Sequence, residues 1–176
     1  MVHTLALPSM SSRLLRAPLA AASAVLLLSG CSAAVALQPA ADATNEGCAE
    51  VSVRLPDVVA ELPERETNAQ GTAAWGTPAA VILHCGVTPP GPTTELCVSV
   101  SGVDWIIDES QAADDIYTLT TYGRDPAVEI TVDQSRASGT SAVVDLANAV
   151  SYLPQERACT NVSDTDTLDP PTTPAG

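Results

Sequence analysis

The stretch Ile116-Tyr-Thr-Leu-Thr-Thr-Tyr-Gly-Arg-Asp-Pro-Ala-Val-Glu-Ile-Thr-Val132 carries the strongest fold signal in this chain of 176 residues. Two runs rich in β-branched and aromatic residues, 116–122 and 128–132, lie on either side of a segment that contains Gly, Asp and Pro. Such runs favour strands, and the cluster between them favours a turn. The stretch therefore predicts two strands joined by a turn.

Upstream residues extend the same sheet. The apolar run Ala79-Ala-Val-Ile-Leu-His-Cys85 predicts a buried strand. Leu96, Val98 and Val100 alternate with small or polar residues, which predicts a strand that continues through a bulge at Gly102 into 103–107.

The region before residue 79 gives weaker signals. Alternation of Val51, Val53 and Leu55 predicts a short strand. A helix is expected over 56–62 because Pro63 would end it, and the aperiodic stretch 65–76 is expected to be a loop.

Apolar residues return at helical spacing near the C-terminus, at Val143, Leu146, Ala147 and Val150. Ser138 and Ser141 precede this helix and are interpreted as its turn and cap. The expected fold class is α+β, with a mainly antiparallel sheet of about four to five strands, helices on one face, and disulfides that staple it.

The first 30 residues predict a signal peptide. Arg13 and Arg16 precede the apolar run 17–28, which is too short for a membrane span of about 20 residues. The following Leu28-Ser-Gly-Cys31 resembles the lipobox of bacterial lipoproteins, in which the cysteine receives a diacylglycerol. The alternative is a secretory cut after Ala34-Val-Ala36, which would release the protein.

Composition divides the rest of the chain into three parts. Residues 31–47 are small and polar and are expected to form a lipidated flexible tether, followed by a single α+β domain over 48–159. Residues 160–176 are acidic and rich in Pro and Thr, which predicts a disordered tail.

The chain is strongly acidic. Its formal charge is -14 with no lysine, and removal of Arg13 and Arg16 lowers the charge to -16. Nucleic acids and anionic lipid headgroups both bind through clustered positive charge, so a surface this acidic is expected to repel them, and nucleic acids are excluded as partners. No cofactor is expected, and phenylalanine is absent, so Trp75 and Trp105 are the expected large core residues.

Four cysteines remain after Cys31, an even number that favours disulfides in an exported chain. The favoured pairs are Cys85–Cys97, around a Pro-rich loop, and Cys48–Cys159, at the edges of the domain. A metal site including His84, or a redox dithiol, is the competing interpretation. The cysteine gaps are long and contain no C-x-x-C, so no metal ligands are assigned.

Several segments together resemble the DUF3515 family of uncharacterised actinobacterial envelope proteins. They are Arg65-Glu-Thr67, Ala74-Trp-Gly-Thr-Pro78, Leu83-His-Cys-Gly-Val87, Gly102-Val-Asp-Trp105 and Gly123-Arg124. The resemblance spans about 48–159, and His84 departs from it because the family commonly has a basic residue there. It implies an envelope location and a single domain, and no activity is established for the family.

No catalytic residues are assigned. His84 is the only histidine after the signal peptide, and it is interpreted as a strand residue at the sheet surface. A possible binding patch combines residues that can receive an anionic or ring-bearing ligand or a partner protein: Arg65, Trp75, Asp104, Trp105 and Arg124. The alternative is structural, with both tryptophans in the core, Asp104 paired with an arginine, and Arg124 exposed in a turn.

The expected protein is an exported lipoprotein, held on the extracytoplasmic face of the cell membrane by lipid on Cys31. It is expected to be non-enzymatic and to bind an envelope protein or a small ligand. A small envelope enzyme and an acidic structural surface protein are the alternatives. An enzyme would show a concave pocket with converging polar groups and a shifted titrating group, whereas a protein-binding module would show an apolar patch.

The lipid anchor is tested by replacing Cys31 with Ala. The variant should leave the membrane fraction and lose the mass of diacylglycerol, because two acyl chains suffice for stable anchoring. Fractionation and intact-mass measurement check this. A variant that stays with membranes, beside a wild type without lipid mass, would contradict the prediction.

Overall fold

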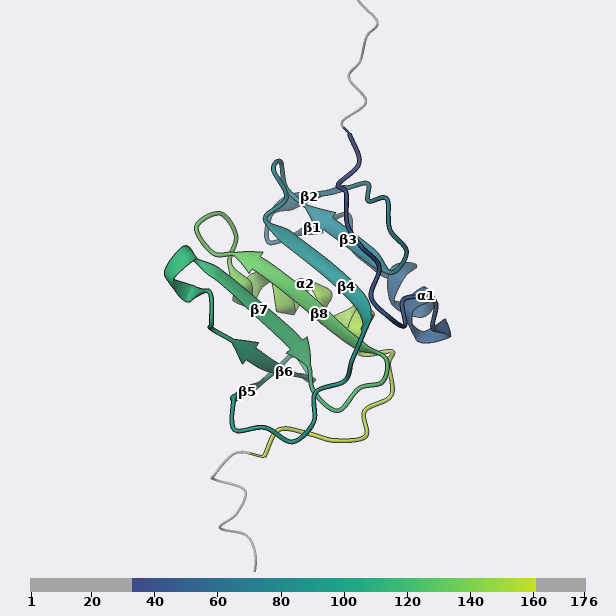
Figure 1. Cartoon of the computed structure of the whole chain (residues 1–176), viewed down its shortest axis with the longest axis vertical. Helices are drawn as coiled ribbons and strands as arrows, with labels where there is room; N and C mark the ends of the chain where they lie inside the picture. The colour runs from purple at the N-terminus through teal and green to yellow at the C-terminus, as the bar shows by residue number, and fades with distance from the viewer. Residues whose placement is uncertain (1–32, 161–176) are drawn as a thin grey trace, which may run out of the picture. The chain divides into compact units, whose positions relative to one another are not determined.

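The computed structural model describes residues 33–160, so Cys31, the signal-peptide region and residues 161–176 lie outside the described part. Its elements, in chain order, are α1 (Glu46–Ser52), β1 (Val58–Val59), β2 (Leu62–Arg65), β3 (Thr72–Trp75), β4 (Val81–Val87), β5 (Leu96–Val100), β6 (Val103–Asp108), a 3-10 turn (Ala112–Asp114), β7 (Ile116–Thr121), β8 (Ala127–Asp133) and α2 (Gly139–Val150). The strands form one antiparallel sheet in the order β1-β2-β3-β4-β8-β7-β6-β5 (Figure 1).

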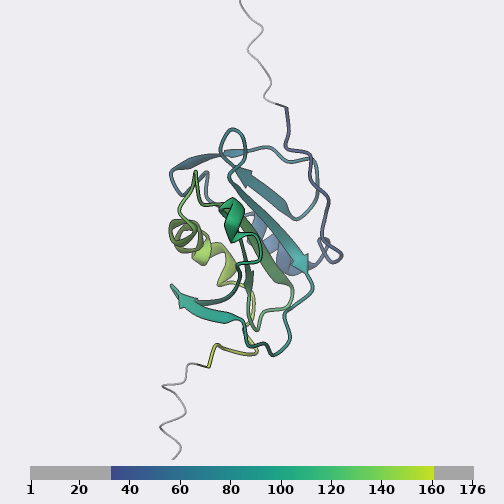
Figure 2. The ribbon, with the colours of Figure 1, turned by 60° about the vertical axis from the view of Figure 1, so that its left-hand side comes forward.

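Helix α2 lies against one face of this sheet. It contacts the central strand β8 and also both edge strands, β1 and β5. A flat sheet of eight strands would span more than 30 Å at about 4.8 Å per strand, far wider than one helix. The sheet therefore curls around α2, which lies behind the central strands in Figure 1 and beside them in Figure 2.

The core fills the space between α2 and the concave face of the sheet. Trp75 and Trp105 are 0% exposed and are its largest side chains. They come from β3 and β6, on the same face as Leu83 and Ile130, because directly paired residues point the same way. Leu146 of α2 is also 0% exposed. Because the chain has no phenylalanine, the two tryptophans fill the core space that phenylalanine side chains commonly occupy.

The predicted count of four to five strands is wrong, because the sheet has eight. One additional strand arises because the chain reverses direction at Ser101 and Gly102, which have φ of 51° and 79°. Two successive positive φ values are typical of a tight hairpin turn, whereas a bulge would keep the chain in one strand. The expected single strand over 96–107 is therefore the hairpin β5–β6.

The other additional strands are β1, β2 and β3, where a helix and a loop were expected. Ala60 and Glu61 turn the chain between β1 and β2 with φ of 48° and 65°. Residues other than glycine rarely adopt this conformation. The Ala60 amide donates to Asp145 Oδ2 of α2 at 2.8 Å, so a contact distant in sequence supports the turn.

The predicted strand over Val51, Val53 and Leu55 is also wrong, because Val51 belongs to α1, which ends at Ser52, and neither Val53 nor Leu55 lies in a strand. Asn45 caps α1 by accepting a hydrogen bond from the Gly47 amide at 2.9 Å, and Glu46 lies in the first turn. Both features stabilise a helix N-terminus. Val51 is fully buried, whereas Val53, two residues later, is 77% exposed. In a strand both side chains would lie on the same face, so the spacing of these valines does not indicate a strand.

All four cysteines of the described part form disulfides, but the favoured pairing is wrong. The bonds are Cys48–Cys85 and Cys97–Cys159. Three strands separate β4 from β5, so Cys85 and Cys97 stand about 19 Å apart at the usual strand spacing, beyond the reach of a disulfide. The chain-entropy model assigns about 4 kcal/mol to each observed bond.

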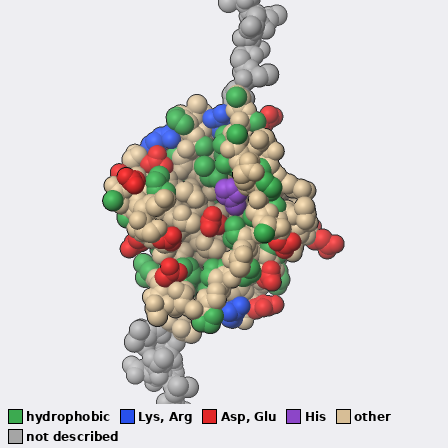
Figure 3. Space-filling view, viewed as in Figure 1, with side chains coloured by type: hydrophobic (Ala, Val, Ile, Leu, Met, Phe, Trp, Pro, Cys, Tyr) green, Lys and Arg blue, Asp and Glu red, His purple; other side chains and the backbone are tan. Residues whose placement is uncertain are grey.

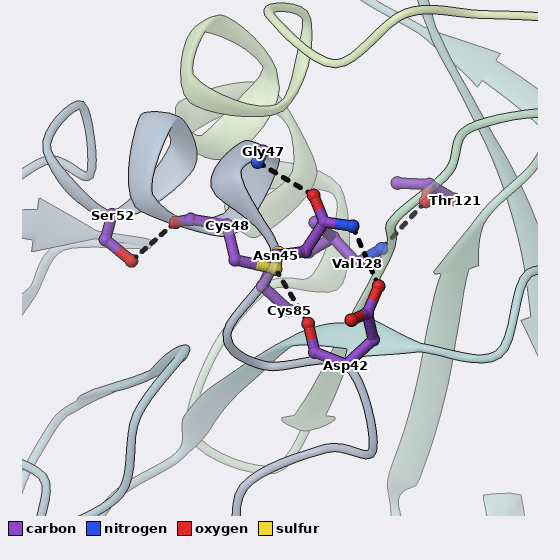
Figure 4. The surroundings of a disulfide bond; sticks show 8 residues. All are labelled: Asp42, Asn45, Gly47, Cys48, Ser52, Cys85, Thr121 and Val128. Carbon is purple, nitrogen blue, oxygen red and sulfur yellow. Dashed lines mark hydrogen bonds between the residues drawn. A yellow bond between two sulfur atoms is a disulfide. The ribbon is translucent and has the colours of Figure 1, made fainter.

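The two disulfides lie on opposite faces of the sheet. Cys85 shares the concave face with Leu83, and its bond attaches α1 beside the Asn45 cap (Figure 4). Cys97 is paired with Ile106 and therefore points to the outer face, where its bond holds the C-terminal segment. Each bond fastens one end of the described chain to the sheet.

The expected flexible tether over 31–47 is replaced by an ordered N-terminal segment, here residues 33–45. Val35 forms a bridge with Thr67, and the Asp42 amide donates to the Gly86 carbonyl at 3.0 Å. Gly86 has φ of 90°, and a Cβ there would lie 2.3 Å from the Asp42 backbone. Among the described residues, no helix is long and apolar enough to cross a bilayer.

The dependence of the fold on α2 is tested with two substitutions in that helix. Leu146→Ala should lower the free energy of unfolding by about 2–5 kcal/mol, because it leaves a cavity in the core. Val144 is 47% exposed on the same helix, and Val144→Ala should change stability by no more than about 0.5 kcal/mol. Denaturant unfolding measures both, and equal effects would show that α2 does not anchor the core.

Candidate functional site

Four of the five residues of the expected binding patch are buried. Trp75 and Trp105 are core residues, and the Trp75 indole Nε1 donates to the Pro56 carbonyl at 3.0 Å. Asp104 is 5% exposed and Arg124 is 4% exposed, so the expectation that Arg124 is exposed in a turn is wrong. These side chains offer little surface to a ligand, which favours the structural alternative for this set.

Asp104 and Arg124 together hold the C-terminal strap, residues 153–159. Asp104 Oδ2 accepts from Gln155 Nε2 and from the Cys159 amide, both at 2.9 Å. Arg124 donates to the carbonyl of Leu153 and, at 3.3 Å, to Gln155 Oε1. The Glu156 amide adds a bond to the Gly123 carbonyl at 2.7 Å.

The burial of the charged Arg124 guanidinium is only partly compensated by its surroundings. Burial lowers the pKa of its guanidinium, and the charge of Asp104 opposes that shift. Its Nε has no hydrogen-bond partner among the described residues, and the same is true of Trp105 Nε1. The cluster therefore holds the strap in place but leaves two buried N–H donors unpaired within the described chain. This lowers stability, because water would bind these donors in the unfolded chain.

Arg65 is the fifth patch residue, and it lies far from this cluster along the sheet. It is half-buried on β2, where it donates to the Gly76 carbonyl and Thr77 Oγ1, both at 3.3 Å. A third bond, at 2.8 Å, goes to the carbonyl of Ala33. Arg65 thus attaches the N-terminal segment to the sheet, as Arg124 attaches the strap.

The outer face of the sheet carries His84 at its centre. His84 is opposite Thr72 on β3 and opposite Glu129 on β8. It is the only histidine of the described part, so it is the purple group in Figure 3, where acidic side chains lie nearby. This position matches its interpretation as a sheet-surface residue. The described residues contain no group of three or more His, Cys, Asp or Glu that could hold a metal.

A groove of about 150 Å³ opens between the edge of the sheet and the first turn of α2. Its walls are apolar on the strand side, and polar groups stand where strands and helix end. The lining residues are Val98, Val100, Ile107, Glu109, Tyr117, Leu119, Gln134, Gly139, Thr140 and Val143. Sequence reasoning missed this groove, since its two walls are about 40 residues apart in the chain.

Strand β5, beside the groove, is an edge strand. Within the described chain it pairs only with β6, so its other edge has no strand partner. Its sequence, Leu96-Cys-Val-Ser-Val100, contains no charge, Pro or Gly, and Leu96 is 55% exposed. Proteins usually protect such edges with charges or prolines, so an unprotected edge is a candidate docking surface.

The groups with shifted pKa values do not line this groove. Burial, together with the charge of Asp57, raises the pKa of Glu64 on β2. Hydrogen bonds from Ser110 lower the pKa of Asp108, which is a common effect in a polar turn. The groove is lined mainly by apolar side chains, as expected of a surface for apolar contact.

The role of the strap is tested at two glycines with similar backbone. Gly102 and Gly123 have φ of 79° and 73°, and a Cβ at Gly102 would meet nothing within 4 Å. At Gly123 it would lie 2.0 Å from the Arg157 carbonyl oxygen. Gly102→Ala should therefore cost about 1 kcal/mol from backbone strain alone.

Gly123→Ala should cost clearly more than Gly102→Ala and should release the strap. Denaturant unfolding measures the stability difference, and hydrogen exchange at the Cys159 amide reports the release. Equal stability losses with a protected Cys159 amide would show that the strap does not depend on this contact.

Comparisons with known proteins identify the family and nothing more. No curated protein and no solved structure matches the chain. A family model described as "Protein of unknown function (DUF3515)" matches residues 15–158, which include the Arg65, Asp104 and Arg124 segments described above. Because this match covers most of the sequence, the chain belongs to the DUF3515 family.

Proposed function

We propose that the protein is an exported, lipid-anchored envelope protein that binds an extended segment of a partner protein along β5. The observation that carries the proposal is the unprotected β5 edge beside an apolar groove. The segment would add a strand to the sheet, and one of its apolar side chains would enter the groove.

The edge supplies the affinity through its backbone. Amide and carbonyl groups on the free side of β5 can form an antiparallel ladder with an extended peptide, as in other cases of strand addition. The β5 sequence favours an extended chain and contains no proline that would interrupt the ladder.

The groove supplies the selectivity. Val98 and Val100 point to the concave side of β5, because Val98 is paired with the buried Trp105. Alternate side chains of an added strand would point the same way, toward the first turn of α2. A volume of about 150 Å³ suits a single aliphatic side chain, not a large ligand.

Charge favours a basic partner over a second copy of this chain. Glu95 precedes β5, Asp108 ends its partner strand β6, and Glu109 follows that strand. Each exported copy would have a formal charge of -16, from -14 with Arg13 and Arg16 removed, so two copies would repel each other when their edges meet. A segment with Lys or Arg at its ends would instead be attracted.

The proposed location rests on the sequence Leu28-Ser-Gly-Cys31, which lies outside the described residues. The two disulfides support an oxidising compartment such as the outside of the cell. An anchor on Cys31 would leave the folded domain in that compartment.

The binding mode is tested with a synthetic peptide in which Val and Thr alternate between lysine ends. It should shift the backbone amide signals of β5 in NMR spectra. Val98→Thr should weaken binding about fourfold, the factor for roughly 0.8 kcal/mol of apolar contact. Val144→Thr is the matched control, because Val144 is exposed on α2 and does not line the groove.

A second peptide with Pro at its centre checks the ladder, because proline lacks the backbone donor. It should bind more weakly than the first peptide. Equal binding of both peptides, shifts away from β5, or equal effects of the two valine variants would each contradict strand addition.

A further inference from the structure

We infer that the turn between β3 and β4, with Arg65 and Arg136 on either side of it, faces the headgroups of the membrane that holds the lipid. The inference rests on the proposed anchor at Cys31 and adds an orientation to it. It follows from where the described chain begins and from what surrounds that point.

The described chain begins in a fixed position on the domain. The Ala33 carbonyl accepts from Arg65, and the Val35 amide donates to the Glu66 carbonyl at 2.8 Å. The Leu37 amide donates to Asn68 Oδ1 at 2.8 Å. These contacts attach the N-terminal segment to the end of β2, so Ala33 does not move freely relative to the sheet.

Only two residue steps separate Cys31 from Ala33. A fully extended chain covers about 7 Å in two residue steps. This reach is shorter than the width of two neighbouring strands together with their side chains. A lipid on Cys31 would therefore hold the end of β2 within roughly this distance of the headgroup layer. A tether of the expected length would have allowed every orientation, whereas this one allows few.

The surface at this end fits a bilayer. Thr77 and Pro78 are exposed at the tip of the turn, and Arg136 donates to the Pro78 carbonyl at 2.6 Å. Arg136 also lies 3.8 Å from Asp133, which neutralises it only in part. Guanidinium groups bind phosphate well, so both arginines can contact lipid headgroups.

Charge on the rest of the chain favours the same orientation. Only five arginines follow the signal-peptide region, and Arg65 and Arg136 both hold this turn. Figure 3 shows basic groups at the end of the domain where the described chain begins and another at the opposite end, with acidic groups spread over the visible face. An anionic membrane attracts basic groups and repels acidic groups within a Debye length of about 10 Å.

The opposite end of the domain points away from the bilayer in this orientation. In Figure 1 the first and last coloured segments of the chain, purple and yellow, lie at opposite ends of the domain, and β5 lies at the end with the yellow segment. The β5 edge and its groove would therefore be presented outward.

The test uses the chain from Cys31 to Gly176, which contains all the contacts described here. The Cys31 thiol is coupled to a maleimide lipid in bilayer discs of phosphatidylcholine and phosphatidylglycerol, with some headgroups carrying Gd³⁺. Amide signals of Gly76, Thr77, Ala79 and Ala80 and of Gln134 to Ala137 should be lost, and those of β5 should remain. Uniform loss, or loss centred on β5, would overturn the inference.

Two variants separate the short attachment from the charge. A Gly/Ser insertion of about 20 residues after Ser32, with a coil reach of roughly 25 Å, should abolish the selective loss. Arg136→Gln should reduce it, whereas Arg54→Gln should not, because Arg54 pairs with Glu50 on α1. If the insertion variant keeps the selective loss, the short attachment does not set the orientation.

The coupling to lipid is chemical, so the result does not depend on whether cells lipidate Cys31. Fractionation of Cys31→Ala decides that separate question. Failure of the orientation and failure of the anchor are thus distinguishable.

Discussion

The structure depends on the packing of one helix into the concave side of one sheet. Helix α2 has 12 residues and must cover a sheet of eight strands, so the sheet curls until both edge strands reach it. Leu146 and the two tryptophans fill the enclosed space. The curl also creates the groove, because β5 approaches α2 without quite closing against its first turn. Core and candidate site are therefore two results of the same constraint.

The segments that resemble the family pattern serve mainly to fasten the two ends of the domain. Arg65 binds the N-terminal segment and the turn after β3, while Asp104 and Arg124 bind the C-terminal strap. Arginines that donate to carbonyls of two other segments, as Arg65 and Arg124 both do, are costly to replace, because any smaller side chain leaves those carbonyls unpaired. Such residues mark a structural requirement of this fold, and the candidate binding surface lies elsewhere, on β5.

The sequence predicts those elements in which burial of one face sets the side-chain pattern. Strands β4, β7 and β8 and helix α2 were expected near their observed positions, β5 and β6 were expected as one continuous strand, and Ser138 caps α2 as predicted. The short strands β1 to β3 have two to four residues each, too few for a period to show. The turn at Ala60 and Glu61 lacks the usual glycine and relies on Asp145, which is distant in sequence.

Two further features lay beyond sequence reasoning. The burial of Trp105 was expected from the absence of phenylalanine, but residue type alone could not show that Arg124 is buried too, since a guanidinium suits both a ligand site and a buried hydrogen-bond cluster. The disulfide pairing depends on strand order, and the crossing from β4 to the far edge at β5 separates Cys85 from Cys97.

The disulfide connectivity has a consequence for how the chain matures. The loops closed by Cys48–Cys85 and Cys97–Cys159 follow each other along the chain without overlapping. In a polypeptide threaded through a membrane with its N-terminus first, Cys48 and Cys85 emerge before the other two. The first two of these thiols to meet an oxidant are then native partners, and so are the last two. Oxidation in order of emergence yields the correct bonds, with no need for an enzyme that reshuffles them.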